Sequence, residues 1–411
     1  MLSRIRIPKR NCFGLSASSS TLFSPTSEYA QFRSMLRGFV EKEVEPQAME
    51  FDAQERMNVP LLKKLGQLGV HGICVPEDYG GADMNAVGTV IAMEELSYSD
   101  PGLCLSALAH SVLFVHNLSN NASDEQKAKW LPAAVSGDII GGMAMSEPHV
   151  GTDVMGMKTS ASLSSDKQHW ILNGEKMWIT NGALSESELG DIFLVYAKTP
   201  SGGISLFVVE KGSPGFSLGQ KLKGKCGMRS SNTAELVLSD CKIPVANLVG
   251  VEGKGTIPMM KNLEIERVAL AAMSLGIARR CIDVMVKYSS DRVAFGKPIA
   301  SFGQVQRHIA ESYAEYTAAR TYVYAVANEL NLEKPGNRLD SDGVKLVATT
   351  MGKNVADRAI QVLGGYGYLS EYVVERLWRD AKLLEIGGGT LEAHQKNITM
   401  DLVRAVGGPK I

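Results

Sequence analysis

The amino-acid sequence predicts a mainly α-helical protein with a β module in its middle, and three observations support this fold class. Apolar residues recur at intervals of three and four between residues 28 and 140, the spacing that places them on one face of a helix. Short strand-like runs separated by turn residues fill residues 141–248. The helical spacing then returns over residues 249–411. This order predicts an N-terminal helical domain, a middle β-barrel domain and a C-terminal four-helix bundle, divided at these positions.

The first 27 residues differ in composition from the rest of the chain. They contain four basic residues within the first ten, many serines, and no acidic residue before Glu28. This composition is typical of a mitochondrial transit peptide, which is removed from the mature protein. We therefore expect a protein of the mitochondrial matrix and leave residues 1–27 out of the fold; an unstructured tail is the alternative.

The N-terminal domain is expected to begin with a helix capped by Ser27. Apolar residues carry this helix to residue 40, and Pro46 lies at or just past its end. Further helical stretches are expected at residues 61–68, 86–96 and 126–134. Turn signals such as Asp100-Pro101-Gly102 separate them.

The middle domain is expected to contain strands at residues 170–172, 192–196, 204–209 and 234–238. Turn residues between these runs favour a small barrel or sandwich. The C-terminal domain shows helical spacing over residues 259–288, 301–332 and 343–363. These stretches exceed the average helix of about 11 residues and are long enough for a four-helix bundle.

Composition and missing motifs exclude several classes of function. The 43 Lys and Arg residues nearly balance the 44 Asp and Glu residues, so no nucleic-acid partner is expected. Charges are expected to interrupt the apolar stretches before the roughly 20 residues that a membrane span needs, so no membrane insertion is expected. The histidines lack the spacing of a metal site. Neither a GxGxxG after a strand nor a GxxxxGKS/T loop is present.

Three stretches of sequence carry the functional signal when they are taken together. They are Ala144-Met145-Ser146-Glu147-Pro148-His149-Val150-Gly151-Thr152-Asp153, Met177-Trp178-Ile179-Thr180-Asn181-Gly182, and Gly364-Gly365-Tyr366-Gly367-Tyr368 followed by Arg379-Asp380-Ala381-Lys382. At these separations they resemble the acyl-CoA dehydrogenase family, and the resemblance runs unbroken over about residues 28–405. Within the family it is nearest to the branch that oxidises isovaleryl-CoA in leucine catabolism.

The resemblance implies FAD as cofactor, an acyl-CoA as substrate, α,β-dehydrogenation, electron-transfer flavoprotein as electron acceptor, and a homotetramer. The positions that match the family's FAD contacts are Met143, Ala144, Met145, Ser146, Thr152, Trp178, Ile179, Thr180, Arg292, Gln361, Val362, Leu363, Gly364, Gly365, Thr390 and Glu392. The positions that match its substrate contacts are Thr152, Ile257, Glu264, Arg267, Gly388 and Gly389.

The middle domain carries the residues expected around the flavin ring. Trp178 and Thr180 lie two apart on an expected extended segment, so their side chains should project to the same side. The resemblance implies that the indole covers the ring and that the hydroxyl reaches flavin N5. A Trp that fills the core of the barrel is the alternative.

One helix carries two candidates for the base that removes a proton alpha to a thioester. Such a base is a carboxylate in an apolar pocket, with its pKa raised toward neutrality. Glu264 and Glu266 are two residues apart, so about 200° separates them and only one can face the acyl chain. Leu263 and Leu270 share the face of Glu266, whereas Arg267 follows Glu264 at i+3 and predicts a surface or structural ion pair there.

The resemblance also selects Glu266. Most members of the family carry the base immediately before a late Gly-Thr, and in this chain that slot is Gly388. A minority carry it at the position of Glu266. The resemblance further implies that the backbone N–H of Gly388, with a ribityl hydroxyl of FAD, polarises the thioester carbonyl. A buried, paired carboxylate of the helical bundle is the alternative for Glu266.

Arg292 matches an arginine that reaches the FAD pyrophosphate of a neighbouring subunit, and residues 361–365 match a stretch that lines the adenosine half across the same interface. A solvated cation at a helix end is the alternative for Arg292.

Three positions depart from the isovaleryl pattern. A glutamine that contacts FAD is replaced by Gly303, with Gln304 and Gln306 beside it; a tyrosine of the acyl pocket is replaced by Ile257; and an arginine after Ser201 is replaced by Gly202. A changed pocket wall shifts preference by about 1–3 kcal/mol. Butanoyl-, 2-methylbutanoyl- or isobutanoyl-CoA therefore stay alternative substrates, an acyl-CoA oxidase is an alternative reaction, and a non-catalytic flavoprotein scaffold is an alternative of another class.

Overall fold

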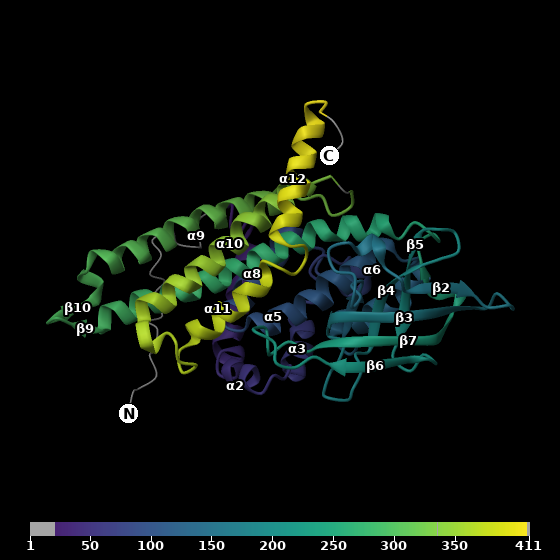
Figure 1. Ribbon diagram of the computed structural model, residues 1–411, viewed down its shortest axis with the longest axis horizontal. Helices are drawn as coiled ribbons and strands as arrows, with labels where there is room; N and C mark the ends of the chain where they lie inside the picture. The colour runs from purple at the N-terminus through teal and green to yellow at the C-terminus, as the bar shows by residue number, and fades with distance from the viewer. Residues whose placement is uncertain (1–20, 335, 409–411) are drawn as a thin grey trace.

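The computed structural model describes residues 21–334 and 336–408. Most of the predicted transit peptide, residues 1–20, lies outside the described residues. The structure confirms the predicted order of helices, strands and helices. Figure 1 shows the strands of the middle domain gathered at one end of the molecule, with the long C-terminal helices running away from them.

The N-terminal domain consists of short helices and two π-helical segments, Val40–Val44 and Ala109–His116. The α-helices are α1 (Ser27–Phe39), α2 (Ala48–Ala53), α3 (Val59–Gln67), α4 (Ala86–Ser97), α5 (Pro101–Leu108), α6 (Asn117–Asn121) and α7 (Asp124–Ser136). The expected cap at Ser27 is wrong, because the N-cap is Thr26 and no side chain caps this helix. A capping box of Ser123 and Gln126 starts α7.

The continuous helical stretch Pro101–Asn121 corrects one expectation. It contains no Asp, Glu, Lys or Arg, so charge does not interrupt every apolar stretch before 20 residues. By length and composition it is the one helix among the described residues that could cross a membrane, but 94% of its apolar window is buried inside the fold. Its apolar surface is therefore covered by the protein itself.

The middle domain forms one sheet in the order β6-β7-β3-β2-β4-β5-β8, with β1 paired beside β4. The strands are β1 (Gly141–Ala144), β2 (Ser160–Leu163), β3 (His169–Thr180), β4 (Ile192–Lys198), β5 (Ile204–Glu210), β6 (Phe216–Lys221), β7 (Thr233–Pro244) and β8 (Leu248–Val249). β1 runs parallel to β4, whereas β3 is antiparallel to β7. This arrangement brings the segment after β1 next to the end of β3, where the functional motifs lie.

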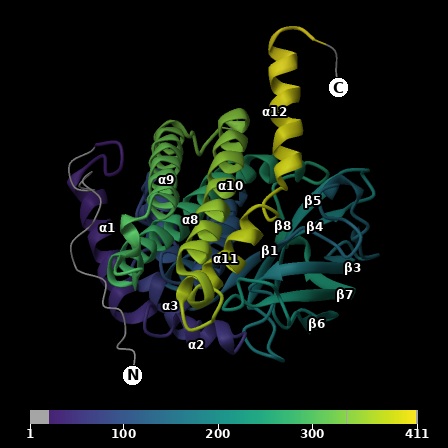
Figure 2. The ribbon, with the colours of Figure 1, turned by 60° about the vertical axis from the view of Figure 1, so that its left-hand side comes forward.

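The C-terminal domain is a bundle of α8 (Thr256–Asp291), α9 (Gly303–Glu329), α10 (Arg338–Leu363) and α11 (Val373–Leu384). A hairpin of β9 (Val293–Ala294) and β10 (Lys297–Pro298) connects α8 to α9. The last helix, α12 (Leu391–Ala405), stands away from the bundle in both ribbon views (Figure 2). Within α12, His394 is the buried residue.

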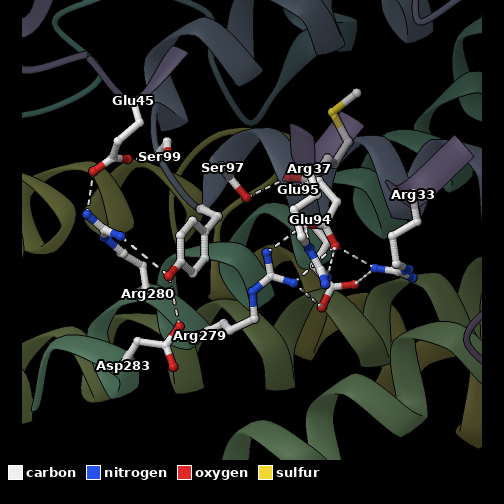
Figure 3. A network of polar contacts seen from close by, with 12 residues as sticks. Arg33, Arg37, Glu45, Glu94, Glu95, Ser97, Ser99, Arg279, Arg280 and Asp283 are labelled. Atoms are coloured by element: carbon white, nitrogen blue, oxygen red, sulfur yellow. Dashed lines mark hydrogen bonds and ion pairs between the residues drawn. The ribbon is translucent and has the colours of Figure 1, made fainter. Parts of the chain in front are cut away.

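A buried charge network fixes α8 against the N-terminal domain. Glu94 and Glu95 of α4 lie between Arg33 of α1 and Arg279 of α8 (Figure 3). The ion-pair distances are 2.9 Å from Arg33 to Glu94 and 2.8 Å from Arg279 to Glu95. Burial alone would raise the pKa of Glu94, but the surrounding arginines, Arg320 foremost, hold it well below its ordinary value.

The Arg379-Asp380 motif holds the three domains together. Arg379 Nη2 lies 2.9 Å from Asp52 Oδ2 in the N-terminal domain. Asp380 Oδ1 accepts a 2.5 Å hydrogen bond from the backbone N–H of Met228 in the middle domain. Gly227 permits this contact, because a Cβ there would lie 2.3 Å from the carbonyl oxygen of Arg379. The Arg379-Asp380 part of the third sequence motif thus has a structural role that involves no ligand.

Candidate active site

Glu266 lies in the first half of α8 and is buried, with 7% of its surface exposed. Its Oε2 atom has no hydrogen-bond partner among the residues that the structure describes. Burial raises the pKa of the Glu266 carboxyl to about 7, and the positive charges of Arg267 and Lys345 oppose this rise. A carboxyl with these properties can accept a proton near neutral pH.

The loop between α11 and α12 presses against this carboxyl. A Cβ at Gly388 would lie 3.2 Å from Glu266 Oε1 and only 2.4 Å from Leu270 Cδ1. Gly388 also has a φ of +65°, a conformation that favours glycine. The two positions at which the sequence resemblance places a base, Glu266 on α8 and the late Gly-Thr position, therefore meet in space.

Glu266 also lies near the other two domains. Burial, and then the nearby Glu266 carboxylate, raise the pKa of Tyr196 on β4. The hydroxyl of Tyr196 accepts a 3.3 Å hydrogen bond from Asn117 of α6 in the N-terminal domain. A middle-domain side chain that contacts the N-terminal domain thus lies close enough to the carboxyl for its charge to affect the pKa of that side chain.

The second carboxyl of this helix, Glu264, does not make the expected ion pair. It is buried, so a surface position is wrong, and its oxygens accept hydrogen bonds from the backbone N–H groups of Gly336 at 3.1 Å and Asn337 at 3.0 Å. These groups stand at the start of α10, where a negative charge is favourable. Arg267 instead forms an ion pair with Asp342 of α10, with 3.1 Å between Nε and Oδ1. Both side chains join α8 to α10.

The two sequence motifs of the middle domain lie side by side. The backbone N–H of Met177 donates a 3.0 Å hydrogen bond to the carbonyl of Ser146, which links the end of β3 to the segment after β1. Trp178 is 53% exposed, so it does not fill the core of the sheet. An exposed indole beside a loop rich in backbone donors fits the edge and face of a planar ring such as a flavin.

The strand geometry at Trp178 corrects the sequence-based reason for its direction. The register of β3 against β7 shifts between Lys176 and Ile179, and Trp178 has a φ of +60°. The segment is therefore a β-bulge and not a regular extended strand. Ile179 is buried, whereas Trp178 is exposed and Thr180 is half-buried.

A buried ion pair supports this surface from below, and the sequence analysis missed it. Lys176 Nζ is fully buried and donates 3.0 Å hydrogen bonds to the carbonyl of Met145 and to Glu147 Oε1. Although burial opposes ionisation, bonds from Thr159 and the backbone of Lys158, together with Lys176, lower the pKa of Glu147 to about 2. The alternation of β3 could have revealed Lys176, because a lysine at an inward position needs a partner.

The remaining candidates of this half of the site are more exposed. Thr152 is exposed, and Ile257 in the first turn of α8 is 61% exposed. Thr390 caps α12 by accepting a 3.3 Å hydrogen bond from the backbone N–H of Ala393, and Glu392 is exposed on the same turn.

The structure does not bring Arg292 or residues 361–365 to this site within one chain. Figure 1 places the β9–β10 hairpin at the opposite end of the molecule from β3. Arg292 lies over the ring of Tyr366, 5.9 Å from its centroid, so the two segments do lie together there. Phe295, three residues after Arg292, is 94% exposed.

The residues of the second group, Arg292 and residues 361–365, differ in whether their side chains are exposed to a ligand. Gln361, Gly364 and Gly365 are exposed, whereas the side chains of Val362 and Leu363 are buried in the bundle core, so only their backbone atoms could reach a ligand. Both glutamines after Gly303 are exposed, and Gln306 donates a 3.0 Å hydrogen bond to the carbonyl of Ala300.

Comparison with known proteins assigns the family. Three family models match: the N-terminal domain of acyl-CoA dehydrogenase over residues 26–138, its middle domain over 142–241 and its C-terminal domain over 253–403. The mitochondrial isovaleryl-CoA dehydrogenase of Oryza sativa subsp. japonica is 42% identical over 95% of this chain and 94% of that protein. The mitochondrial 2-methylacyl-CoA dehydrogenase of Solanum tuberosum is 39% identical over 94% and 93% of the two chains.

Solved structures agree with the sequence relatives. The butyryl-CoA dehydrogenase of Megasphaera elsdenii has a TM-score of 0.88 and 35% identity, and the match covers 92% of this chain and 99% of that one. An acyl-CoA dehydrogenase of Bacillus anthracis in complex with FAD has a TM-score of 0.86 and 30% identity, over 93% of this chain and 68% of that one. The chain belongs to the acyl-CoA dehydrogenase family and is an FAD-dependent enzyme of that family.

Proposed function

We propose that this enzyme oxidises a short branched acyl-CoA, isovaleryl-CoA, to 3-methylcrotonyl-CoA, with Glu266 as the catalytic base. The observation that carries the proposal is the buried Glu266 carboxyl, whose Oε2 has no partner among the described residues and which lies against Gly388. The identity to isovaleryl-CoA dehydrogenases supports the choice of substrate.

The chemistry follows from the environment of Glu266. The Cα–H bond breaks and its proton passes to the carboxylate, which is a stronger base than an ordinary glutamate because burial raises the pKa of Glu266 to about 7. The backbone N–H of Gly388 stabilises the negative charge that develops on the thioester oxygen. FAD, when bound, would supply the acceptor for the hydride that leaves Cβ, and electron-transfer flavoprotein is the proposed acceptor of the electrons. Fixing the acyl chain between base and acceptor contributes a large part of the rate.

The binding of FAD is proposed to involve two subunits. Residues 143–146, Thr152 and 178–180 would hold the flavin half, with Thr390 and Glu392 nearby. Arg292 and residues 361–365 of a neighbouring subunit would hold the pyrophosphate and adenosine. Their position at the opposite end of the chain and the exposed Phe295 support this sharing and a homotetramer. The basic, Ser-rich leader and the mitochondrial relatives support a matrix location.

The substrate assignment is tested with a panel of acyl-CoA thioesters. The purified flavin-loaded enzyme is mixed anaerobically with isovaleryl-, 2-methylbutanoyl-, isobutanoyl- and butanoyl-CoA, and loss of flavin absorbance is recorded. Isovaleryl-CoA should react with the highest kcat/KM, and the product should be lighter by two hydrogen atoms. A higher kcat/KM with 2-methylbutanoyl-CoA would reassign the substrate, and peroxide release under air at the same rate would favour an oxidase.

A further inference from the structure

The carbonyl oxygen of Gly389 is held by two buried side chains from different helices. Lys345 Nζ of α10 donates a hydrogen bond to it at 2.6 Å. His394 Nε2 of α12 lies 3.0 Å from the same oxygen. Both side chains are fully buried, which is unusual for two groups that can each carry a positive charge. Loop carbonyls usually face water, so this arrangement is a specific one.

Asp342 orients the histidine. Its Oδ1 lies 2.6 Å from His394 Nδ1, and Asp342 is itself fully buried on α10, one turn before Lys345. A carboxylate and a backbone carbonyl can only accept hydrogen bonds. The two ring nitrogens of His394 thus each lie within hydrogen-bond distance of one of these oxygens, which fixes the orientation of the ring.

Other charges face this group from each neighbouring helix. Arg267 of α8 is ion-paired with Asp342, and Glu266 of α8 and Glu385, directly after α11, are close enough to Lys345 to raise its pKa. Burial has the larger and opposite effect, so the pKa of Lys345 is lowered to about 8. The cluster therefore couples the charge of Lys345 to that of Glu266.

The loop that carries the Gly389 carbonyl has little space to move. A Cβ at Gly388 would collide with Leu270 of α8, and a Cβ at Gly389 would lie 2.9 Å from the His394 ring. Three successive glycines have more conformational freedom than any other tripeptide, so their order must come from contacts outside the loop. The two hydrogen bonds to Gly389 provide such contacts next to the peptide that faces Glu266.

We propose that Lys345 and His394, the latter oriented by Asp342, are positioning residues that hold the Gly388–Gly389 peptide against Glu266. This inference rests on the proposed function. In that function the base on α8 and the N–H of Gly388 must act on adjacent atoms of one thioester, and a rigid loop keeps the two groups in place. A displacement of about 1 Å in such a constellation can lower the rate about 100-fold.

The anchoring is tested first by a measurement that needs no turnover. Backbone hydrogen exchange of residues 386–390 is followed by mass spectrometry in flavin-loaded wild type, Lys345→Met, His394→Leu and His394→Gln. Exchange should be at least about tenfold faster in Lys345→Met and His394→Leu. It should stay near wild type in His394→Gln, whose amide can still donate to Gly389. Thr349→Val, one turn further along α10 and bonded to the carbonyl of Lys345, is the matched buried control. Unchanged exchange in both Lys345→Met and His394→Leu overturns the proposal.

The functional consequence is tested with the acyl-CoA that reacts best. Lys345→Met and His394→Leu should lower kcat about 10- to 100-fold and change KM by less than about threefold. Lys345→Met should also move the acidic limb of the pH profile upward by about one unit, because a positive charge near Glu266 is lost. Faster exchange with unchanged kcat would overturn the positioning role. A wild type that oxidises no acyl-CoA would refute the proposed function, and the exchange result would still decide whether these residues anchor the loop.

Discussion

The backbone of Gly388 lies against the carboxyl of Glu266, so close that a Cβ on the glycine would be 3.2 Å from Glu266 Oε1. These two residues, 122 positions apart in the chain, thus lie next to each other, one on helix α8 and the other in the loop before α12. A carboxyl could enter the site from either side, but Leu270 and the left-handed backbone leave no room for a side chain at residue 388.

This contact predicts that the catalytic carboxyl can be moved from residue 266 to residue 388. Glu266→Gly should abolish turnover. Adding Gly388→Glu and Leu270→Ala should raise the rate at least about tenfold above that of Glu266→Gly, because the new carboxyl reaches the same atoms. Strain at residue 388 costs about 1–3 kcal/mol, so recovery will be partial. The Glu266→Gly/Leu270→Ala double variant is the control. Recovery no greater than in this control would show that the two positions are not equivalent.

Glu266 also makes the folded state dependent on pH. The pKa of Glu266 rises from 4.5 to about 7 on folding, so its ionised form lowers the free energy of unfolding. This loss of stability is absent below pH 4.5, grows between pH 4.5 and 7, and is complete above pH 7. A shift of this size corresponds to about 3 kcal/mol. Glu266→Gln should therefore increase the free energy of unfolding by up to about 3 kcal/mol at pH 8.5 and by far less at pH 4.5. Equal effects at both pH values would contradict the buried carboxylate.

The Lys176–Glu147 pair is expected to hold the segment after β1 in place. Lys176→Met removes the positive partner of Glu147. Breaking a buried ion pair in this way lowers the free energy of unfolding by about 3–5 kcal/mol. FAD should dissociate more readily, and Trp178 fluorescence should be less quenched by the flavin. The Lys176→Met/Glu147→Gln double variant should recover part of the stability. Additive losses in denaturant unfolding would show that the two groups do not interact.

Glu264 is expected to act on structure and not on substrate. Glu264→Gln weakens charge-assisted hydrogen bonds to Gly336 and Asn337, which should cost about 1–2 kcal/mol of unfolding free energy. KM for the acyl-CoA should stay within about twofold of the wild-type value. A large increase in KM without loss of stability would assign Glu264 to substrate binding after all.

Sharing of FAD between subunits is tested by mixing two defective variants. Arg292→Ala and Trp178→Ala chains alone should bind FAD poorly, because each removes one half of every site. A mixed oligomer contains one site in which both residues are intact, so co-expression should restore a fraction of the bound flavin. No recovery in oligomers shown by mass to be mixed would place Arg292 outside a shared site.

The sequence predicted the fold class and the helix face of Glu266 because both depend on local spacing. Contacts between segments far apart in the sequence were not predictable in the same way. The partners of Glu264 are backbone groups at residues 336 and 337, and those of Lys345 and His394 lie in a glycine loop; nothing in the local pattern of either segment indicates the other. The bulge at Trp178 was missed because alternation in a strand presumes regular pairing.

Rapid anaerobic mixing with isovaleryl-CoA measures directly whether Glu266 removes the α-proton. Loss of flavin absorbance is followed in wild type and Glu266→Gln, with acyl-CoA affinity measured separately by equilibrium binding. We expect the variant to retain FAD, to bind the thioester within about threefold of wild type and to react at least about 1,000-fold more slowly, since the base is gone. A Glu266→Gln enzyme that bleaches at the wild-type rate would show that Glu266 is not the base.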